Sequence, residues 1–126
     1  NLSAVKGDSL QYLLEQGVMM INSELTVEYK KPGSHKGLWE EFHKFFIEEV
    51  INKYYPGTIF VFSGKDSQRL EKYVAPMMHY TFQTEHPVAA SYQNREWNTD
   101  GVFKKINTIL KQNNGAEIEF LETLPF

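Results

Sequence analysis

A three-layer α/β/α fold with a mainly parallel central sheet is predicted by two features of the sequence. Three runs of strand length, residues 18–21, 58–62 and 77–83, are rich in apolar, aromatic or β-branched side chains. Segments with the helical spacing of apolar residues lie between and after these runs. Continuous apolar strands are typical of sheets covered on both faces, and their alternation with helices indicates parallel pairing.

Helices are predicted on both sides of each run. They cover residues 8–14, 37–55, 66–73 and 100–112, and turn-forming Gly, Pro or Asn residues follow most of them. The longest helix, 37–55, carries an apolar stripe that we expect to face the core. The members of this stripe are Trp39, Phe42, Phe46 and Val50.

The composition is that of an ordinary globular protein, and we predict a single domain over residues 1–126. Apolar residues make up 41% and charged residues 23% of the chain, which excludes a disordered protein. The chain has no Cys, so disulfides and thiolate zinc sites are excluded, and a net charge of −3 gives no global basic field. No apolar run reaches the roughly 20 residues of a membrane span. Asn1 stands where an initiator Met is usual, so we expect a piece of a longer protein.

Polar, turn-forming residues follow each predicted strand, where ligands bind in parallel sheets. Asn22, after the first strand, has an amide suited to the edge of a nucleobase, although Asn is also common in plain turns. Gly64, after the second, allows a ligand close to the backbone or is simply a turn glycine. His86, after the third, is held extended by Pro87 and could donate a hydrogen bond to a developing oxyanion. An ordinary surface or packed histidine is the alternative for His86.

Other chemistry finds little support. The sequence has no Gly-rich phosphate loop and no nucleophile elbow, and its four histidines lack close ligand spacing, so we predict no metal and no cofactor. Two basic clusters could meet phosphates or could be ordinary surface charge. One consists of Lys30, Lys31 and Lys36, and the other of Arg95, Lys104, Lys105 and Lys111.

Taken in order, these segments resemble the C-terminal half of the uracil-DNA glycosylases of the Ung family. Residues 16–22, Gln-Gly-Val-Met-Met-Ile-Asn, are similar to the family's strand that ends in its uracil-reading Asn. Residues 60–64, Phe-Val-Phe-Ser-Gly, stand where the family has a strand ending in a Gly-Ser loop. Residues 83–91, Gln-Thr-Glu-His-Pro-Val-Ala-Ala-Ser, stand where it has a His-Pro-Ser-Pro-Leu-Ser loop. Further matches, in the same order, are residues 25–27, 33–36, 39–40, Phe103, Asn107 and Leu110.

The resemblance implies a protein that flips a uracil nucleotide out of DNA and cleaves its N-glycosidic bond. It implies that Asn22 binds the uracil edge and excludes cytosine. His86 would be the catalytic donor to the uracil oxygen that gains charge as the base leaves. The Gly64 backbone and Ser91 would hold flanking phosphates. A DNA-repair protein inside the cell, cytoplasmic or associated with the nucleoid, follows from this function.

Some positions depart from the family pattern. Ala90 stands at the family's Leu that enters the base stack, so invasion of duplex DNA should be weaker and single-stranded DNA favoured. Lys65 replaces the Ser of the Gly-Ser loop and could still meet a phosphate as a point charge. Arg95 and Trp97 lie just beyond the last loop, where they could reach DNA, although Trp97 could equally pack in the fold.

A larger departure is that the 126 residues contain no Gly-Gln-Asp-Pro-Tyr-His motif, which activates water in the family. The family's first sheet strand is also lacking, and it lies between the strands that match residues 18–21 and 58–62. Unpaired backbone in the middle of a sheet is costly. We therefore expect a second chain or an N-terminal segment to complete the sheet, or the strands to pair differently.

Three hypotheses remain open from the sequence. The first is a uracil-DNA glycosylase whose remaining half supplies the water-activating Asp, with the 126 residues alone inactive. The second is a non-catalytic DNA-binding or accessory protein on the same scaffold, favoured by Ala90 and the lack of that Asp. The third is an unrelated small α/β interaction module.

Overall fold

The computed structural model describes residues 11–22, 25–26, 28–86, 92–94, 101–113 and 115–119. The chain divides into two compact units, one of Asn1–Ile21 with Thr99–Phe126 and the other of Asn22–Asn98. The prediction of a single domain stays a prediction.

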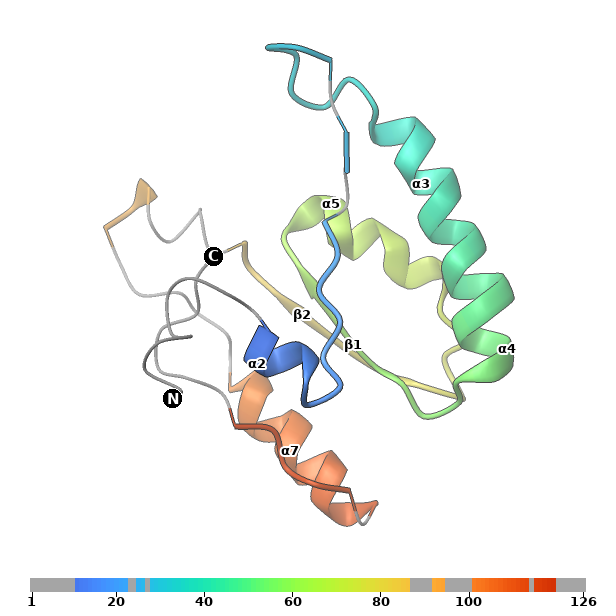
Figure 1. The fold of residues 1–126 in the computed structure, drawn as a ribbon, viewed down its shortest axis with the longest axis vertical. Coiled ribbons are helices and arrows are strands. Elements are labelled where there is room, and N and C mark those ends of the chain that lie inside the picture. Colours follow the sequence, from blue (N-terminus) through green and yellow to red (C-terminus); the bar gives the residue numbers. More distant parts are fainter. Residues whose placement is uncertain are drawn as a thin grey trace. The chain divides into compact units, whose positions relative to one another are not determined.

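A parallel pair of strands forms the centre of the unit Asn22–Asn98 (Figure 1). Strand β1 (Ile59–Ser63) pairs with β2 (Tyr80–Thr84) in a register that sets Ile59 opposite Tyr80 and Ser63 opposite Thr84. The connection between them contains α5 (Lys65–Gln68) and the 3₁₀ helix η2 (Arg69–Tyr73). A parallel pair requires such a crossover, because a tight turn can join only antiparallel strands. Two of the three predicted strands and the helix between them are therefore confirmed.

One long helical segment precedes the strands. It begins as α3 (Lys36–Phe45), widens into the π-helix η1 (Phe46–Ile51) and ends as α4 (Asn52–Tyr54). Together with η2 and β1 it encloses a core whose buried members are Ile47, Phe62, Leu70 and Val74. Phe60 and Tyr73 pack against these four side chains. Removing each large apolar side chain from water stabilises the fold by roughly 1.5–3 kcal/mol, so this cluster fixes β1 against the helices.

The predicted apolar stripe of the long helix is only partly right. The buried side chains on this helix are His43 and Ile47, at 4% and 5% exposure, whereas Phe42 is 43% exposed. Phe42 instead stacks edge-on with Trp39, with ring centroids 5.3 Å apart. The mismatch begins at His43, in the regular α3 before the π-helical turn, so the buried face is set by contacts with the rest of the unit and not by the spacing of apolar side chains alone.

The predicted strand at residues 18–21 is wrong in the described part of the chain. Residues 18–22 form no ladder, and Met19, Met20 and Ile21 are 63%, 45% and 40% exposed. A strand needs a neighbour to satisfy its backbone groups, and the sheet of the described residues consists of β1 and β2. The apolar run therefore has the composition of a strand but no strand partner among the described residues.

Short helices and an extended segment make up the described part of the other unit. They are α2 (Gln11–Leu14), α7 (Val102–Gln112) and residues 115–119. Two side-chain amides hold the extended segment, each by a pair of hydrogen bonds. The side-chain oxygen of Asn107 accepts a hydrogen bond from the Ile118 N–H at 2.7 Å, and its NH₂ group donates to the Ile118 carbonyl at 2.9 Å. The side-chain oxygen of Gln16 accepts a hydrogen bond from the Glu119 N–H at 2.7 Å, and its NH₂ group donates to the Glu119 carbonyl at 3.3 Å.

None of the helices in the described residues has the length and hydropathy needed to span a bilayer.

Replacing Asn107 with Ala should lower the free energy of unfolding by about 2 kcal/mol, because two hydrogen bonds to half-buried backbone groups are lost at once. Urea denaturation measures the change. Thr108→Ala is the matched control, since the exposed Thr108 hydroxyl bonds only within α7, to the Lys104 carbonyl. Equal losses for both variants would contradict this role of Asn107.

Protonation of His79 should destabilise the fold. His79 is 8% exposed, its Nδ1 accepts the Thr58 N–H at 3.1 Å, and its buried Nε2 has no partner among the described residues. Desolvation lowers the pKa of His79 below the ordinary value of 6.5. The unfolded chain then binds the proton more tightly than the folded chain, so this stability is present above about pH 6.5 and is lost as the pH falls.

The measurement is the thermal midpoint of unfolding between pH 7.5 and pH 5.5 for the wild type and for His79→Asn. The Asn side-chain oxygen can still accept the Thr58 N–H but does not titrate. The wild type should lose more stability than the variant over this interval. Equal decreases in the thermal midpoint for both proteins would show that His79 does not contribute to the pH dependence of stability.

Candidate functional site

The carboxyl ends of β1 and β2 form a rigid platform. Ser63 and Thr84 are register partners, and their hydroxyl oxygens lie 2.7 Å apart in a hydrogen bond. The Thr84 carbonyl accepts two further hydrogen bonds, from the Gly64 N–H at 2.9 Å and from the Gln68 side-chain amide at 3.0 Å. Thr84 is buried, so these bonds are shielded from competing water. The loops that leave the two strands therefore start from fixed positions.

Gly64 and His86 are brought into contact just beyond this platform. A Cβ atom built on Gly64 would lie 3.0 Å from the His86 Cβ and 3.3 Å from its Cδ2. Gly64 also has a φ of +87°, a conformation that side chains rarely adopt. The glycine is thus required twice, by the backbone and by the space that His86 occupies. The sequence predicted both residues as site candidates at adjacent strand ends, and the structure sets them side by side.

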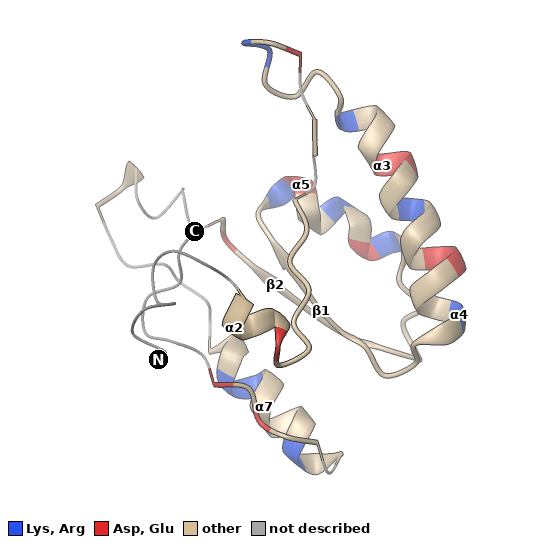
Figure 2. Ribbon diagram, viewed as in Figure 1, with Lys and Arg blue, Asp and Glu red and all other residues tan. Residues whose placement is uncertain are grey.

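Lys65 follows Gly64 as the first residue of α5, and its side chain is exposed. The crossover that it opens is rich in charge, and Figure 2 shows basic and acidic residues interspersed along α5, η2 and α3. Asp66, the next residue, forms ion pairs with Lys36 at 3.0 Å and with Arg69 at 3.9 Å. Lys65 takes part in none of the ion pairs found among the described residues.

Asn22 presents its side chain to solvent. Among the described residues it makes one hydrogen bond, between its backbone carbonyl and the His43 Nε2 at 3.1 Å. Both ends of its side-chain amide, the acceptor oxygen and the NH₂ donor, are therefore without a partner in the described part of the chain. No hydrogen bond joins Asn22 to Gly64, Lys65 or His86 there.

His43 has no sequence signature of a site residue. It is one of four histidines without ligand spacing, and its polarity places it outside the predicted apolar stripe. The one signal that could have found it is position, since His43 lies four residues before Ile47, the buried residue of η1.

The remaining predicted DNA contacts, Ala90, Ser91, Arg95 and Trp97, lie outside the described residues. Among the residues that are described, no group of three or more His, Cys, Asp or Glu side chains could hold a metal ion.

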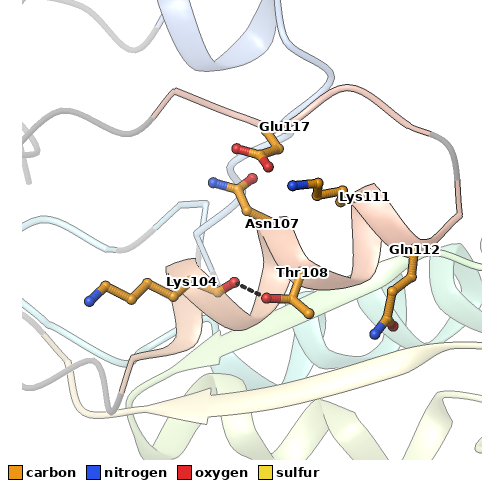
Figure 3. Close-up of a pocket in the computed structure, with 6 residues that line it drawn as sticks. All are labelled: Lys104, Asn107, Thr108, Lys111, Gln112 and Glu117. Atoms are coloured by element: carbon orange, nitrogen blue, oxygen red, sulfur yellow. Dashed lines mark hydrogen bonds between the residues drawn. The ribbon is translucent and has the colours of Figure 1, made fainter.

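Two lysines of the second basic cluster border a surface depression of about 580 Å³ in the unit that contains α7 (Figure 3). Lys104 and Lys111 line it from the helix, together with Asn107, and Glu117 lines it from the extended segment. The Glu117 carboxylate offsets one of the two positive charges. The depression is thus a weaker place for a phosphate than the lysines alone predicted, and it lies in the other unit from Gly64 and His86.

Comparisons with known proteins point to one family. A uracil-DNA glycosylase of Pseudomonas aeruginosa (strain UCBPP-PA14) is 32% identical over 121 residues, which is 95% of this chain and 52% of the relative. One from Buchnera aphidicola subsp. Baizongia pistaciae is 38% identical over 106 residues, or 83% of this chain and 46% of the relative. The chain is homologous to half of a uracil-DNA glycosylase. No family model matches.

Solved structures agree with the sequence comparison. The crystal structure of mimivirus uracil-DNA glycosylase superposes with a TM-score of 0.73 and 30% identity, over 86% of this chain and 45% of that one. A mimivirus UNG variant in complex with UGI gives the same score over 46% of its chain. The resemblance stated from the motifs and the α/β fold class are thus confirmed. The chain spans about half the length of the curated relatives that it matches.

Replacing Gly64 with Ala should displace His86, because the new methyl group would overlap its Cβ and ring. The free energy of unfolding should fall by about 1–3 kcal/mol from the positive φ and the crowding combined. Gly57→Ala is a matched control. Gly57 has a φ of +80°, but no atom lies within 4 Å of the position that its new methyl group would take, so it measures the backbone cost alone.

The measurement is the NMR signal of the His86 ring in both variants, beside their urea denaturation. The ring signals should shift in Gly64→Ala and stay in place in Gly57→Ala. Unchanged His86 signals in Gly64→Ala would contradict the packing role of this glycine.

Proposed function

We propose that this chain is the base-recognising and strand-holding part of a uracil-DNA glycosylase. Together with the other half of the fold, it would hydrolyse the N-glycosidic bond of a uracil nucleotide flipped out of DNA. The observation that carries the proposal is the contact between Gly64 and His86 at the carboxyl ends of two parallel strands. This is where ligands bind in such sheets, and the two residues come from the two loops that match the family.

Asn22 is proposed to read the base. Uracil presents an N3–H donor beside an O4 acceptor, and the free amide of Asn22 can pair with both, through its oxygen and its NH₂ group respectively. Cytosine presents the reverse, an unprotonated N3 beside an NH₂ donor, so the same amide would face donor against donor. A site built to pair with one edge rejects the other because its own polar groups are left unpaired.

His86 is proposed to stabilise the leaving base. When the N-glycosidic bond breaks, its electron pair stays on N1 of the uracil, and negative charge develops on O2, the carbonyl oxygen next to that nitrogen. An imidazole N–H directed at that oxygen offsets the charge without moving, provided the ring is already in place. The packing of His86 on Gly64 is the kind of support that such a fixed donor requires.

DNA is the proposed partner, and the loops around the site are proposed to hold its backbone. Lys65 and Arg95 would contact phosphates through their positive charges. The Gly64 N–H already donates to the Thr84 carbonyl, so it is not available to a phosphate. Ser91 and Ala90 complete the proposed contact. The methyl group of Ala90 is too small to fill the gap that a flipped base leaves in the base stack of duplex DNA. Single-stranded DNA is therefore the proposed preferred substrate. DNA as substrate would place the protein inside the cell.

The 126 residues alone are expected to release no uracil at a useful rate, because nothing in the matched motifs positions the attacking water. A uracil-release assay on single-stranded DNA tests this, with a complete bacterial uracil-DNA glycosylase as positive control. Efficient release by this chain would show that it activates water by groups other than the family motif.

Asn22→Ala should abolish the preference of the chain for DNA that contains uracil. Loss of two hydrogen bonds to the base predicts a drop of about 10- to 100-fold in affinity for a deoxyuridine oligonucleotide. Fluorescence anisotropy measures it, with a matched deoxycytidine oligonucleotide as reference. Asn113→Ala, in which an exposed Asn that bonds within its own helix end is removed, should leave the preference unchanged.

A non-catalytic DNA-binding or accessory protein is the second candidate. Ala90 at the position of the family's stack-entering Leu favours it. This candidate predicts binding that weakens with salt and does not distinguish uracil from cytosine. A preference for uracil that disappears in Asn22→Ala would exclude it.

A further inference from the structure

We infer that His43 is a positioning residue for the proposed base-reading side chain. The inference rests on the proposed function only in that Asn22 reads the base. Its structural part is the hydrogen bond between the His43 Nε2 and the Asn22 carbonyl, at 3.1 Å. His43 belongs to α3, whereas Asn22 lies 21 residues earlier, so the bond ties the end of the Asn22 segment to a helix.

Burial makes this bond specific. The His43 side chain is 4% exposed, and a buried ring nitrogen must find a partner or cost free energy. A backbone carbonyl can only accept, so Nε2 must carry the proton and donate it to Asn22. This requirement selects either the neutral Nε2–H tautomer or the imidazolium, and it excludes the neutral Nδ1–H tautomer.

The bond acts on Asn22 through its peptide plane. The carbonyl of Asn22 shares a planar unit with the next nitrogen, so fixing the oxygen restricts ψ of Asn22. The side chain of Asn22 then leaves a backbone that is already oriented, although the side chain itself is exposed and unpaired among the described residues. Because Asn22 is already ordered before binding, less conformational entropy is lost when the base binds, and the affinity is higher.

A second tie supports the same arrangement. Trp39, one turn before His43 on α3, donates its indole N–H to the Thr26 hydroxyl at 2.8 Å. That hydroxyl also lies 2.8 Å from the His35 Nδ1. Residues 22 and 26 are thus both held to α3 or to the turn that precedes it. Since Trp39 contacts Thr26 and not Asn22, the constraint on Asn22 itself comes from His43.

The first experiment uses the free chain, without DNA. A long-range ¹H–¹⁵N NMR spectrum of the wild type should show His43 protonated at Nε2. An unprotonated Nε2 would overturn the inference whatever any variant does.

His43→Phe keeps a buried ring and removes the donor. The backbone and side-chain amide signals of Asn22 should move toward values of an unstructured chain or broaden, while those of Leu13 and Phe62 stay in place. His43→Gln, whose NH₂ group can reach a similar position, should keep the Asn22 signals close to those of the wild type. His79→Asn is the control, because it replaces another buried histidine, which bonds to the Thr58 N–H and not to Asn22. Unchanged Asn22 signals in His43→Phe would overturn the inference, and if that variant fails to fold, the wild-type protonation state and His43→Gln still decide it.

The second experiment measures the affinity of the same variants for single-stranded oligonucleotides that carry one deoxyuridine or one deoxycytidine. His43→Phe should reduce the preference for deoxyuridine by about 2- to 10-fold, and His43→Gln should restore it. Full preference in His43→Phe would overturn the role in specificity. A wild type without any preference, combined with disturbed Asn22 signals in His43→Phe, would refute the proposed function and leave the positioning of Asn22 by His43 standing.

Discussion

The register between β1 and β2 is the constraint on which the candidate site depends. Ser63 and Thr84 are opposite one another at the last pair of the ladder, and only this pairing lets the Thr84 carbonyl take the Gly64 N–H. A slip of one residue would turn every side chain of a strand to the other face. Phe62 would then leave the core, so the burial of Phe62 against Ile47 and Leu70 holds the register. The contact between Gly64 and His86 is thus a consequence of apolar packing several residues away.

Sequence patterns predicted the part of the fold that is local and the part that is apolar. The strands of residues 59–63 and 80–84 are rich in apolar, aromatic or β-branched side chains, and the helical segment between them is bounded by Gly64 and Val74. Gly64 and His86 could be predicted as neighbours because parallel strands bring their carboxyl ends to one edge. Their direct contact could not, because it depends on a φ of +87° and on the path of the chain after Thr84.

The predictions that were wrong depended on information that a local pattern does not contain. Residues 18–21 have the composition of a strand, but whether a strand forms depends on a partner elsewhere in the chain. The apolar stripe on the long helix follows the spacing of its apolar side chains, but the side chain that the fold buries in α3 is that of His43, next to the exposed Phe42. The position of His43 depends on a distant partner in the same way. The partner of the His43 ring is the backbone carbonyl of Asn22, 21 residues earlier in the chain, and no local pattern predicts that pairing.

The two proposed functional side chains are supported by different parts of the same unit. His86 rests on Gly64 and so on the end of the sheet, whereas Asn22 is held through its backbone by α3. These supports respond to different perturbations. A change that loosens the sheet end would move His86, the group proposed to stabilise the leaving base. A change on the buried face of α3 would move Asn22, the residue proposed to distinguish uracil from cytosine. In the proposed function, specificity and leaving-group stabilisation would therefore be separable, because the hydrogen bond at Asn22 and the packing at His86 involve different side chains.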